Sequence, residues 1–117
     1  MEKIVEQGLL YDFYGELLNE HQKQIYEDAV YNDMSLSEIA DEQGISRQGV
    51  HDLLKRCSKT LEGYETKLHL VEKFQSVKEK IYLINKHTEH AGESGRKELD
   101  IQLQQIKKLS NEILDEL

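Results

Sequence analysis

The sequence predicts an all-α protein that contains a helix-turn-helix. Three observations support this fold class: the 117 residues include no proline, residues 36–56 read as two short helices joined at a glycine, and apolar residues recur every three or four positions in much of the remaining chain. We expect N-terminal helices and the helix-turn-helix in residues 1–62, a long amphipathic helix in 63–90, and a linker with a C-terminal helix in 91–117.

Two amphipathic helices are expected before the motif. Residues 4–18 form the first, and the second covers residues 21–32 with Asn19 as its N-cap. Their apolar faces consist of Leu9, Leu10, Phe13, Leu17 and Leu18 in the first helix and of Ile25, Ala29 and Val30 in the second. We expect four tyrosines of this segment to pack around the small core, the alternative being an aromatic surface for a partner: Tyr11, Tyr14, Tyr26 and Tyr31.

The motif has the residues that two crossing helices require. Ser35 and Glu38 have the spacing of a capping box at the start of the first helix. Gly44 can adopt the left-handed conformation that ends this helix, and Ser46 is the expected N-cap of the second. The inner positions are filled by Leu36, Ile39, Ala40, Ile45, Val50, Leu53 and Leu54. Because other helical pairs share this pattern, it predicts the fold more directly than the function.

The remaining side chains of the second motif helix match the chemistry of DNA. In a docked helix-turn-helix the N-terminal residues of this helix face base edges, while flanking basic residues hold phosphates. The candidates for base contacts are Arg47, Gln48, His51 and Asp52; an arginine suits guanine and a glutamine suits adenine. The candidates for phosphate contacts are Ser46, Lys55, Arg56 and Lys59.

The charge distribution limits this interpretation. The chain has 23 acidic and 15 basic residues, a formal net charge of −8, whereas DNA-binding domains usually have a basic surplus. Residues 1–32 hold seven acids and two bases, but residues 46–59 hold four bases and one acid. One weakly basic element predicts a modest, salt-sensitive affinity. We therefore expect a dimer, a structured target or a protein partner.

A long apolar stripe follows the motif between residues 61 and 84. Burying one exposed leucine or isoleucine contributes about 1.5–3 kcal/mol, so such a stripe is expected to be covered. We predict a homodimer whose interface includes Leu68, Val71, Phe74, Ile81 and Ile84. In the alternative, residues 99–117, which follow a break at 92–95, fold back on the same chain.

No motif indicates catalysis or a cofactor. A P-loop, a dinucleotide fingerprint and a nucleophile elbow are all missing, so we expect neither an enzyme nor a cofactor. His87 and His90 lie three residues apart, but no third ligand accompanies them and no metal site is expected. The acidic N-terminus, the single Cys57 and the lack of an apolar run of about 20 residues predict a cytoplasmic protein that does not bind membranes.

Two resemblances follow from these residues. Residues 36 to 65, especially Ser37-Glu-Ile-Ala40 and the run from Gly44 to Arg56, resemble region 4 of bacterial sigma factors, which implies DNA contacts by Arg47, Gln48, His51 and Lys55. Residues 11 to 85 are similar to the YlxM-like family in the spacing of Tyr11-Asp-Phe-Tyr14, Leu17-Leu18, Gln22-Lys-Gln24, the motif and Leu61-Glu-Gly-Tyr-Glu65. Genes of that family typically neighbour those of the signal recognition particle, which implies a regulator of that pathway. Unlike a sigma factor, the chain has no second DNA-melting domain.

Two functions of different class are therefore expected. The first is a DNA-binding regulator that acts as a dimer and controls genes of the signal recognition particle pathway. The second is a non-enzymatic accessory protein that binds the protein or the RNA of the particle, and the acidity of the chain favours it. RNA recognition usually places exposed aromatic rings beside basic residues, whereas most tyrosines here lie in the acidic half.

Overall fold

The computed structural model describes residues 3–92 and 95–117, and these residues contain helices and no strand. The helices are α1 (Lys3–Tyr14), the 3₁₀ turn η1 (Gly15–Leu17), α2 (Glu20–Val30), α3 (Leu36–Gln43), α4 (Arg47–Leu68), α5 (Leu70–Ala91) and α6 (Arg96–Glu116). The predicted all-α class is thereby confirmed. The chain divides into two compact units, Met1–Val71 and Glu72–Leu117.

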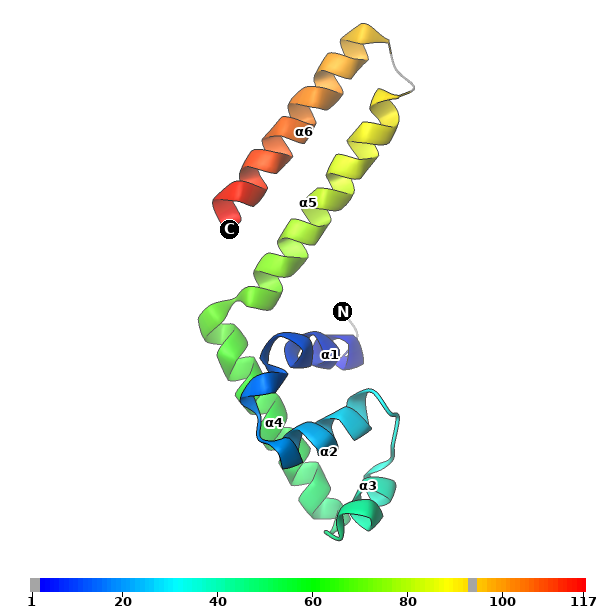
Figure 1. The fold of residues 1–117 in the computed structure, drawn as a ribbon, viewed down its shortest axis with the longest axis vertical. Helices are drawn as coiled ribbons and strands as arrows, with labels where there is room; N and C mark the ends of the chain where they lie inside the picture. Colours follow the sequence, from blue (N-terminus) through cyan, green and yellow to red (C-terminus); the bar gives the residue numbers. More distant parts are fainter. Residues whose placement is uncertain (1–2, 93–94) are drawn as a thin grey trace. The chain divides into compact units, whose positions relative to one another are not determined.

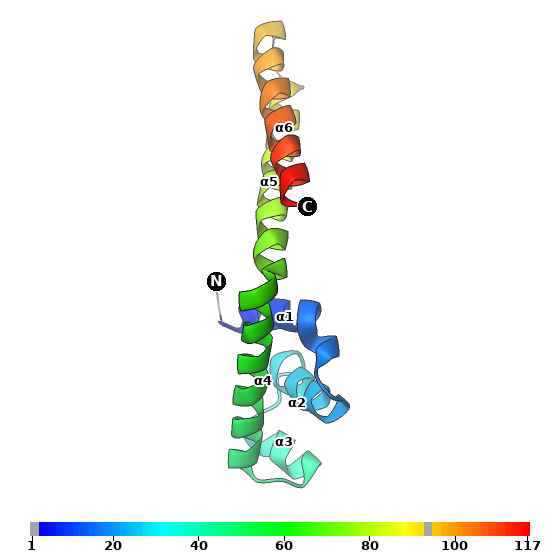
Figure 2. The ribbon, with the colours of Figure 1, turned by 90° about the vertical axis from the view of Figure 1, so that its left-hand side faces the viewer.

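In the first unit, α1, α2 and α3 pack against one side of α4 (Figures 1 and 2). The side of α4 that they cover is the apolar stripe formed by Val50, Leu53, Cys57 and Leu61. Ile25 of α2 and Ile39 of α3 complete the centre of this core and are fully buried. The inner positions predicted for the motif are therefore confirmed at Ile39, Ala40, Val50 and Leu53.

Three predicted caps are present and set the start of three helices. Asn19 Oδ1 accepts from the backbone N–H of Gln22 at 2.8 Å, and Ser35 Oγ accepts from Glu38 N at 3.1 Å. Ser46 Oγ accepts from Gly49 N at 2.9 Å. Gly44 has φ 68°, the left-handed conformation that ends α3. The turn of the motif is therefore fixed by local hydrogen bonds on both sides.

Three of the four tyrosines pack in or against the core, as predicted, whereas Tyr31 is 50% exposed. Tyr14 and Tyr26 are buried, and the ring of Tyr11 stacks on that of Tyr26 with centroids 5.4 Å apart. Tyr31 meets the edge of Tyr11 and donates its hydroxyl hydrogen bond to Asp12 at 2.8 Å, while Tyr11 donates to Glu27. Carboxylates accept hydrogen bonds from three of the four hydroxyl groups, those of Tyr11, Tyr14 and Tyr31.

Two details of the expected helices are wrong. The first helix ends at Tyr14, and the 3₁₀ turn that follows changes the direction of the next side chains, so that Leu17 is 59% exposed. Phe13, which still belongs to α1, lies at the surface. Ile45, expected to plug the turn of the motif, is 37% exposed because the core is already closed by neighbours from α3 and α4.

The helix expected over 63–90 is also interrupted. The structure ends α4 at Leu68, places His69 in the left-handed region with φ 56°, and starts α5 at Leu70. Side chains from distant positions hold this junction: Tyr14 donates to Glu65 Oε1 at 2.5 Å and accepts from Leu70 N at 3.2 Å. The same carboxylate oxygen accepts from Val71 N at 3.0 Å, and the Val71 side chain is buried in the first unit.

The second unit is an antiparallel hairpin in which α6 runs back along α5 (Figure 1). Polar contacts join the two helices. Glu116 accepts from Ser76 at 2.8 Å and from Lys80 at 2.6 Å, and His87 Nδ1 donates to Gln102 Oε1. The fold-back of residues 99–117, given above as the alternative to a dimer interface, is therefore observed, and Glu93 and Ser94 of the expected break lie outside the described residues. No described side chain from Glu72 to Leu117 is buried.

Candidate nucleic-acid interface

The candidate interface is formed by the first half of α4 and its N-cap. Ser46 begins the helix, and Arg47, Gln48, His51 and Asp52 occupy its first two turns. All eight residues predicted to contact DNA are exposed, those four together with Ser46, Lys55, Arg56 and Lys59. The opposite side of the same turns is buried at Val50 and Leu53, which anchors this end of α4 to α3.

Asp52 organises the polar groups of these turns. Gln48 Nε2 donates to Asp52 Oδ1 at 3.0 Å, and His51 Nδ1 lies 3.5 Å from the same oxygen. A carboxylate here can accept from the amino group of cytosine and restricts the orientation of Gln48. The carbonyl oxygen and second amide hydrogen of Gln48 are left to form the paired hydrogen bonds that adenine accepts and donates.

The basic residues lie on different sides of α4. Lys55 and Lys59 follow His51 at intervals of four, which places the three side chains on one stripe of the helix. Arg56 is rotated from Lys55 by about 100° and lies on another side. Ser46 already uses its oxygen as the N-cap, so only its hydroxyl hydrogen is available to a phosphate.

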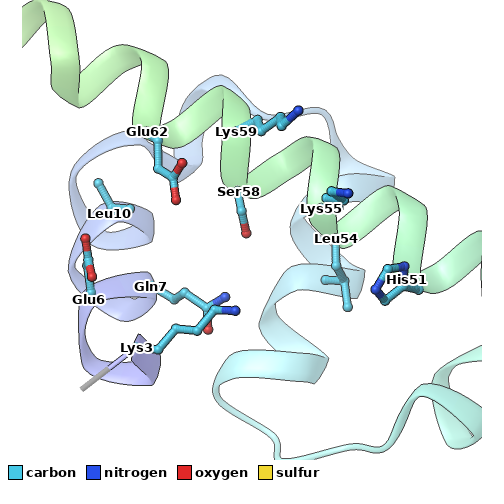
Figure 3. A pocket seen from close by; sticks show the side chains of 10 residues that line it. All are labelled: Lys3, Glu6, Gln7, Leu10, His51, Leu54, Lys55, Ser58, Lys59 and Glu62. Carbon is cyan, nitrogen blue, oxygen red and sulfur yellow. The ribbon is translucent and has the colours of Figure 1, made fainter.

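A cleft of about 460 Å³ lies between α1 and α4 and continues this stripe (Figure 3). Three of its residues, His51, Lys55 and Lys59, belong to the predicted interface. The others are Lys3, Glu6, Gln7 and Leu10 from α1 and Leu54, Ser58 and Glu62 from α4. The two helices therefore share one polar surface.

The contribution of α1 to this surface was not predicted. Lys3 lies in a segment of the sequence with a net charge of −5, and no motif connects it to α4. Only the packing of α1 on α4 brings it to the cleft. Ser58 was missed as well, although its spacing of seven from His51 places it on the same side of the helix.

The remaining sequence candidates lie outside this interface. His87 contacts Gln102, and among residues 3–92 and 95–117 no three histidine, cysteine or acidic side chains gather in the manner of metal ligands. Cys57 is buried in the core, and this burial raises the pKa of its thiol. No described helix combines the length and the apolar character needed to cross a membrane.

Comparison with known proteins identifies related sequences. A family model for UPF0122, described as a helix-turn-helix protein of the YlxM/p13-like type, matches residues 1–116. A UPF0122 protein of Caldanaerobacter subterraneus subsp. tengcongensis is 55% identical over 73 residues, which cover 62% of each chain. One from Thermoanaerobacter sp. (strain X514) is 49% identical over 81 residues, 69% of each chain. One from Clostridium botulinum (strain Alaska E43) is 44% identical over 73% of this chain and 76% of its own.

Proposed function

Because the chain belongs to the UPF0122 family of YlxM/p13-like helix-turn-helix proteins, we propose that it is a non-enzymatic, cytoplasmic regulator that binds double-stranded DNA through the first two turns of α4. One observation carries this proposal: Arg47, Gln48 and His51 are exposed together at the N-terminal end of the second motif helix. In helix-turn-helix proteins this end reads base edges in the major groove. We further propose that the regulated genes are those of the signal recognition particle pathway.

Base contacts are assigned to Arg47, Gln48, His51 and Asp52, and phosphate contacts to Lys55, Arg56, Lys59 and the hydroxyl hydrogen of Ser46. A single copy of the protein is expected to bind DNA weakly, because the four basic residues of 46–59 belong to a chain whose net charge is −8. Affinity supported mainly by a few phosphate contacts falls steeply with salt. Two copies that bind neighbouring half-sites would offset this weakness.

Binding to DNA from upstream of the protein's own gene tests the proposal, measured by gel shift between about 50 and 200 mM salt. Replacing Arg47 and Gln48 together by alanine removes two candidate base contacts, each of which contributes about 1–3 kcal/mol to discrimination. We expect the affinity for the specific site to fall by at least about tenfold. The preference over unrelated DNA should fall with it.

A matched control removes the same two residue types from α6. Arg96 and Gln104 are both exposed there, so the double alanine variant loses the same side chains and the same charge without altering α4. DNA affinity is expected to stay unchanged in this control. Equal affinities of the wild type and the Arg47→Ala, Gln48→Ala variant would exclude the recognition-helix proposal.

A second candidate function is binding to the protein or RNA of the signal recognition particle. The net charge of −5 in residues 1–32 favours a basic partner surface, because opposite charges accelerate association. The same gel shift with the particle's RNA, and a pull-down with its protein, distinguishes the two functions. The first function is favoured if the Arg47→Ala, Gln48→Ala variant loses DNA binding and keeps binding to the particle. The second is favoured if the wild type binds the particle and does not bind DNA.

We also propose that the protein is a homodimer whose interface lies on the α5–α6 hairpin. Among the described residues of the second unit, Phe74, Ile81, Leu103 and Leu114 keep 44–70% of their surface exposed. Residues 74 and 81 are seven positions apart and form one stripe of α5; residues 103 and 114 are eleven apart and form one stripe of α6. The proposed interface requires both stripes to lie on the same side of the hairpin. Ile84, half-buried on α5, belongs to the same proposed interface, whereas Leu68 and Val71 lie in the first unit, where Leu68 is exposed and Val71 is buried.

One substitution at the proposed interface tests the dimer. We expect Ile81→Glu to produce monomers in sedimentation equilibrium at tens of micromolar, and Tyr82→Glu, on the adjacent side of α5, to leave the dimer intact. A monomeric wild type at that concentration would exclude the dimer.

A further inference from the structure

The cleft between α1 and α4 holds three lysines without acidic partners. Lys3, Lys55 and Lys59 line it together with the carboxylates of Glu6 and Glu62. Despite this proximity, none of the three lysines forms an ion pair with any residue that the structure describes. By contrast, Lys23 and Lys80 elsewhere in the chain are paired with glutamates. The cleft therefore has positive charge that the protein itself does not neutralise.

The charges are separated along the cleft. Figure 3 shows Glu6 and Glu62 at the end beside Leu10, and His51 at the opposite end near the start of α4. The side chains of Lys3 and Gln7 extend from α1 into the space between the two helices. An anion would therefore be repelled from one end and attracted toward the end that adjoins the interface.

Hydrogen-bond donors accompany the charge. The hydroxyl of Ser58 points from α4 toward α1, and the amide of Gln7 extends toward it from α1. Ammonium, hydroxyl and amide donors around one space are the groups that bind the oxygens of a phosphate. Leu54 forms an apolar part of the wall beside them.

We propose that this cleft binds a phosphate group, supplied in the complex by the backbone of the duplex bound to α4, and that Lys3 contacts it from α1. The assignment of this phosphate to the DNA backbone rests on the proposed function, DNA binding by α4. A helix rises 1.5 Å per residue, so Lys55 lies roughly 10 Å along α4 from Gln48. The major groove is about 8.5 Å deep. With Gln48 at the base edges and the axis of α4 inclined out of the groove, the part of α4 beside the cleft lies at the level of the phosphates.

The salt dependence of DNA binding tests the contact by Lys3. Each neutralised phosphate contributes about −0.9 to the slope of log K against log salt. We expect Lys3→Ala to remove one such contact, so that the loss of affinity between about 50 and 200 mM salt becomes three- to fourfold smaller than in the wild type. Lys3→Arg keeps the charge and should restore the slope. Lys67→Ala removes an exposed lysine of α4 outside the cleft and should leave the slope unchanged.

A titration with inorganic phosphate distinguishes a backbone phosphate from a free one. Without DNA, changes in the amide NMR signals of Ser58 and Lys59 that disappear in Lys3→Ala would assign the cleft to a small phosphorylated molecule. A changed slope without such signals assigns it to the DNA backbone. An unchanged slope together with no phosphate-dependent signals would overturn the proposal. If the wild type binds no DNA, the proposed function fails, and the phosphate titration alone decides the role of the cleft.

Discussion

Gly49 illustrates how one residue on the recognition helix can be interpreted only with the structure. Glycine inside a helix costs about 1 kcal/mol relative to alanine, which the sequence alone leaves unexplained. A Cβ atom at Gly49 would lie 3.1 Å from Ser46 Oγ, the N-cap oxygen, and no nearer to any side chain of another helix. The missing side chain therefore gives room to the cap rather than to a packed helix of the same chain.

Replacing glycine by alanine is expected to change the free energy of unfolding in opposite directions at Gly15 and at Gly63. A Cβ at Gly15 would lie 2.8 Å from the Tyr11 ring, whereas a Cβ at Gly63 would meet nothing within 4 Å. We expect Gly15→Ala to lower the free energy of unfolding by about 1–3 kcal/mol through overpacking. Gly63→Ala, in the middle of α4, should raise it by about 0.5–1 kcal/mol. Urea denaturation measures both, and equal effects would contradict the packing at Gly15.

Burial of the tyrosines predicts a loss of stability at alkaline pH. Burial is the largest cause that raises the pKa of Tyr26 to about 12, and burial with the hydrogen bond to Glu65 raises that of Tyr14. The folded protein thus holds these protons more strongly than the unfolded chain, whose tyrosines titrate near pH 10. The stabilisation is complete below about pH 10 and is lost as the pH rises toward about 12.

Circular dichroism and phenolate absorbance, recorded across this pH range, check the expected unfolding. Tyr26→Phe removes one of the titrating groups, so its stability should depend less steeply on pH in the same window. A wild-type free energy of unfolding that stays constant from about pH 10 to 12 would contradict the burial of these hydroxyl groups.

At the scale of helices, the sequence predicts the starts of elements better than their ends. Asn19, Ser35 and Ser46 were identified as caps because the hydrogen bonds of a cap join residues three positions apart. The end of α4 was missed because no proline or glycine marks it. His69 adopts its left-handed conformation while Tyr14, 51 residues before Glu65, holds the junction. A contact of that separation cannot be read from local spacing.

This junction yields a prediction about Tyr14. Tyr14→Phe removes the hydroxyl that donates to Glu65 and accepts from Leu70 N, and it leaves the ring in the core. We expect the free energy of unfolding to fall by about 1–3 kcal/mol, the cost of unsatisfied buried polar groups. Hydrogen exchange of the Leu70 and Val71 amides should accelerate. Tyr82→Phe, which removes an exposed hydroxyl from α5, should change stability by less than about 0.5 kcal/mol.

At the scale of the whole molecule, the two units differ in how much they bury. The sequence predicted amphipathic helices after the motif, and α5 and α6 have that character, but periodicity does not specify what covers an apolar face. α6 covers part of α5, and residues such as Ile81 and Leu103 remain about half exposed. The first unit, by contrast, has a buried core that extends from Leu10 to Val71.

This difference predicts how hydrogen exchange depends on protein concentration. If two hairpins associate, the amides of α5 and α6 should exchange more slowly at higher concentration, because association stabilises only the elements that it buries. Amides of α2, α3 and the first half of α4 should show no such dependence. Ile81→Glu should abolish the dependence in α5 and α6. Exchange that is independent of concentration in both units would contradict association through the hairpin.

Chemical labelling of Cys57 reports on the opening of the first unit alone. It is the single thiol of the chain and is buried in the core of that unit. An alkylating reagent can reach the sulfur only when this core opens, and the second unit offers no competing thiol. At low reagent concentration the rate of labelling therefore measures the population of the opened helix-turn-helix, with no probe introduced. Addition of a DNA duplex should slow the labelling in proportion to its occupancy.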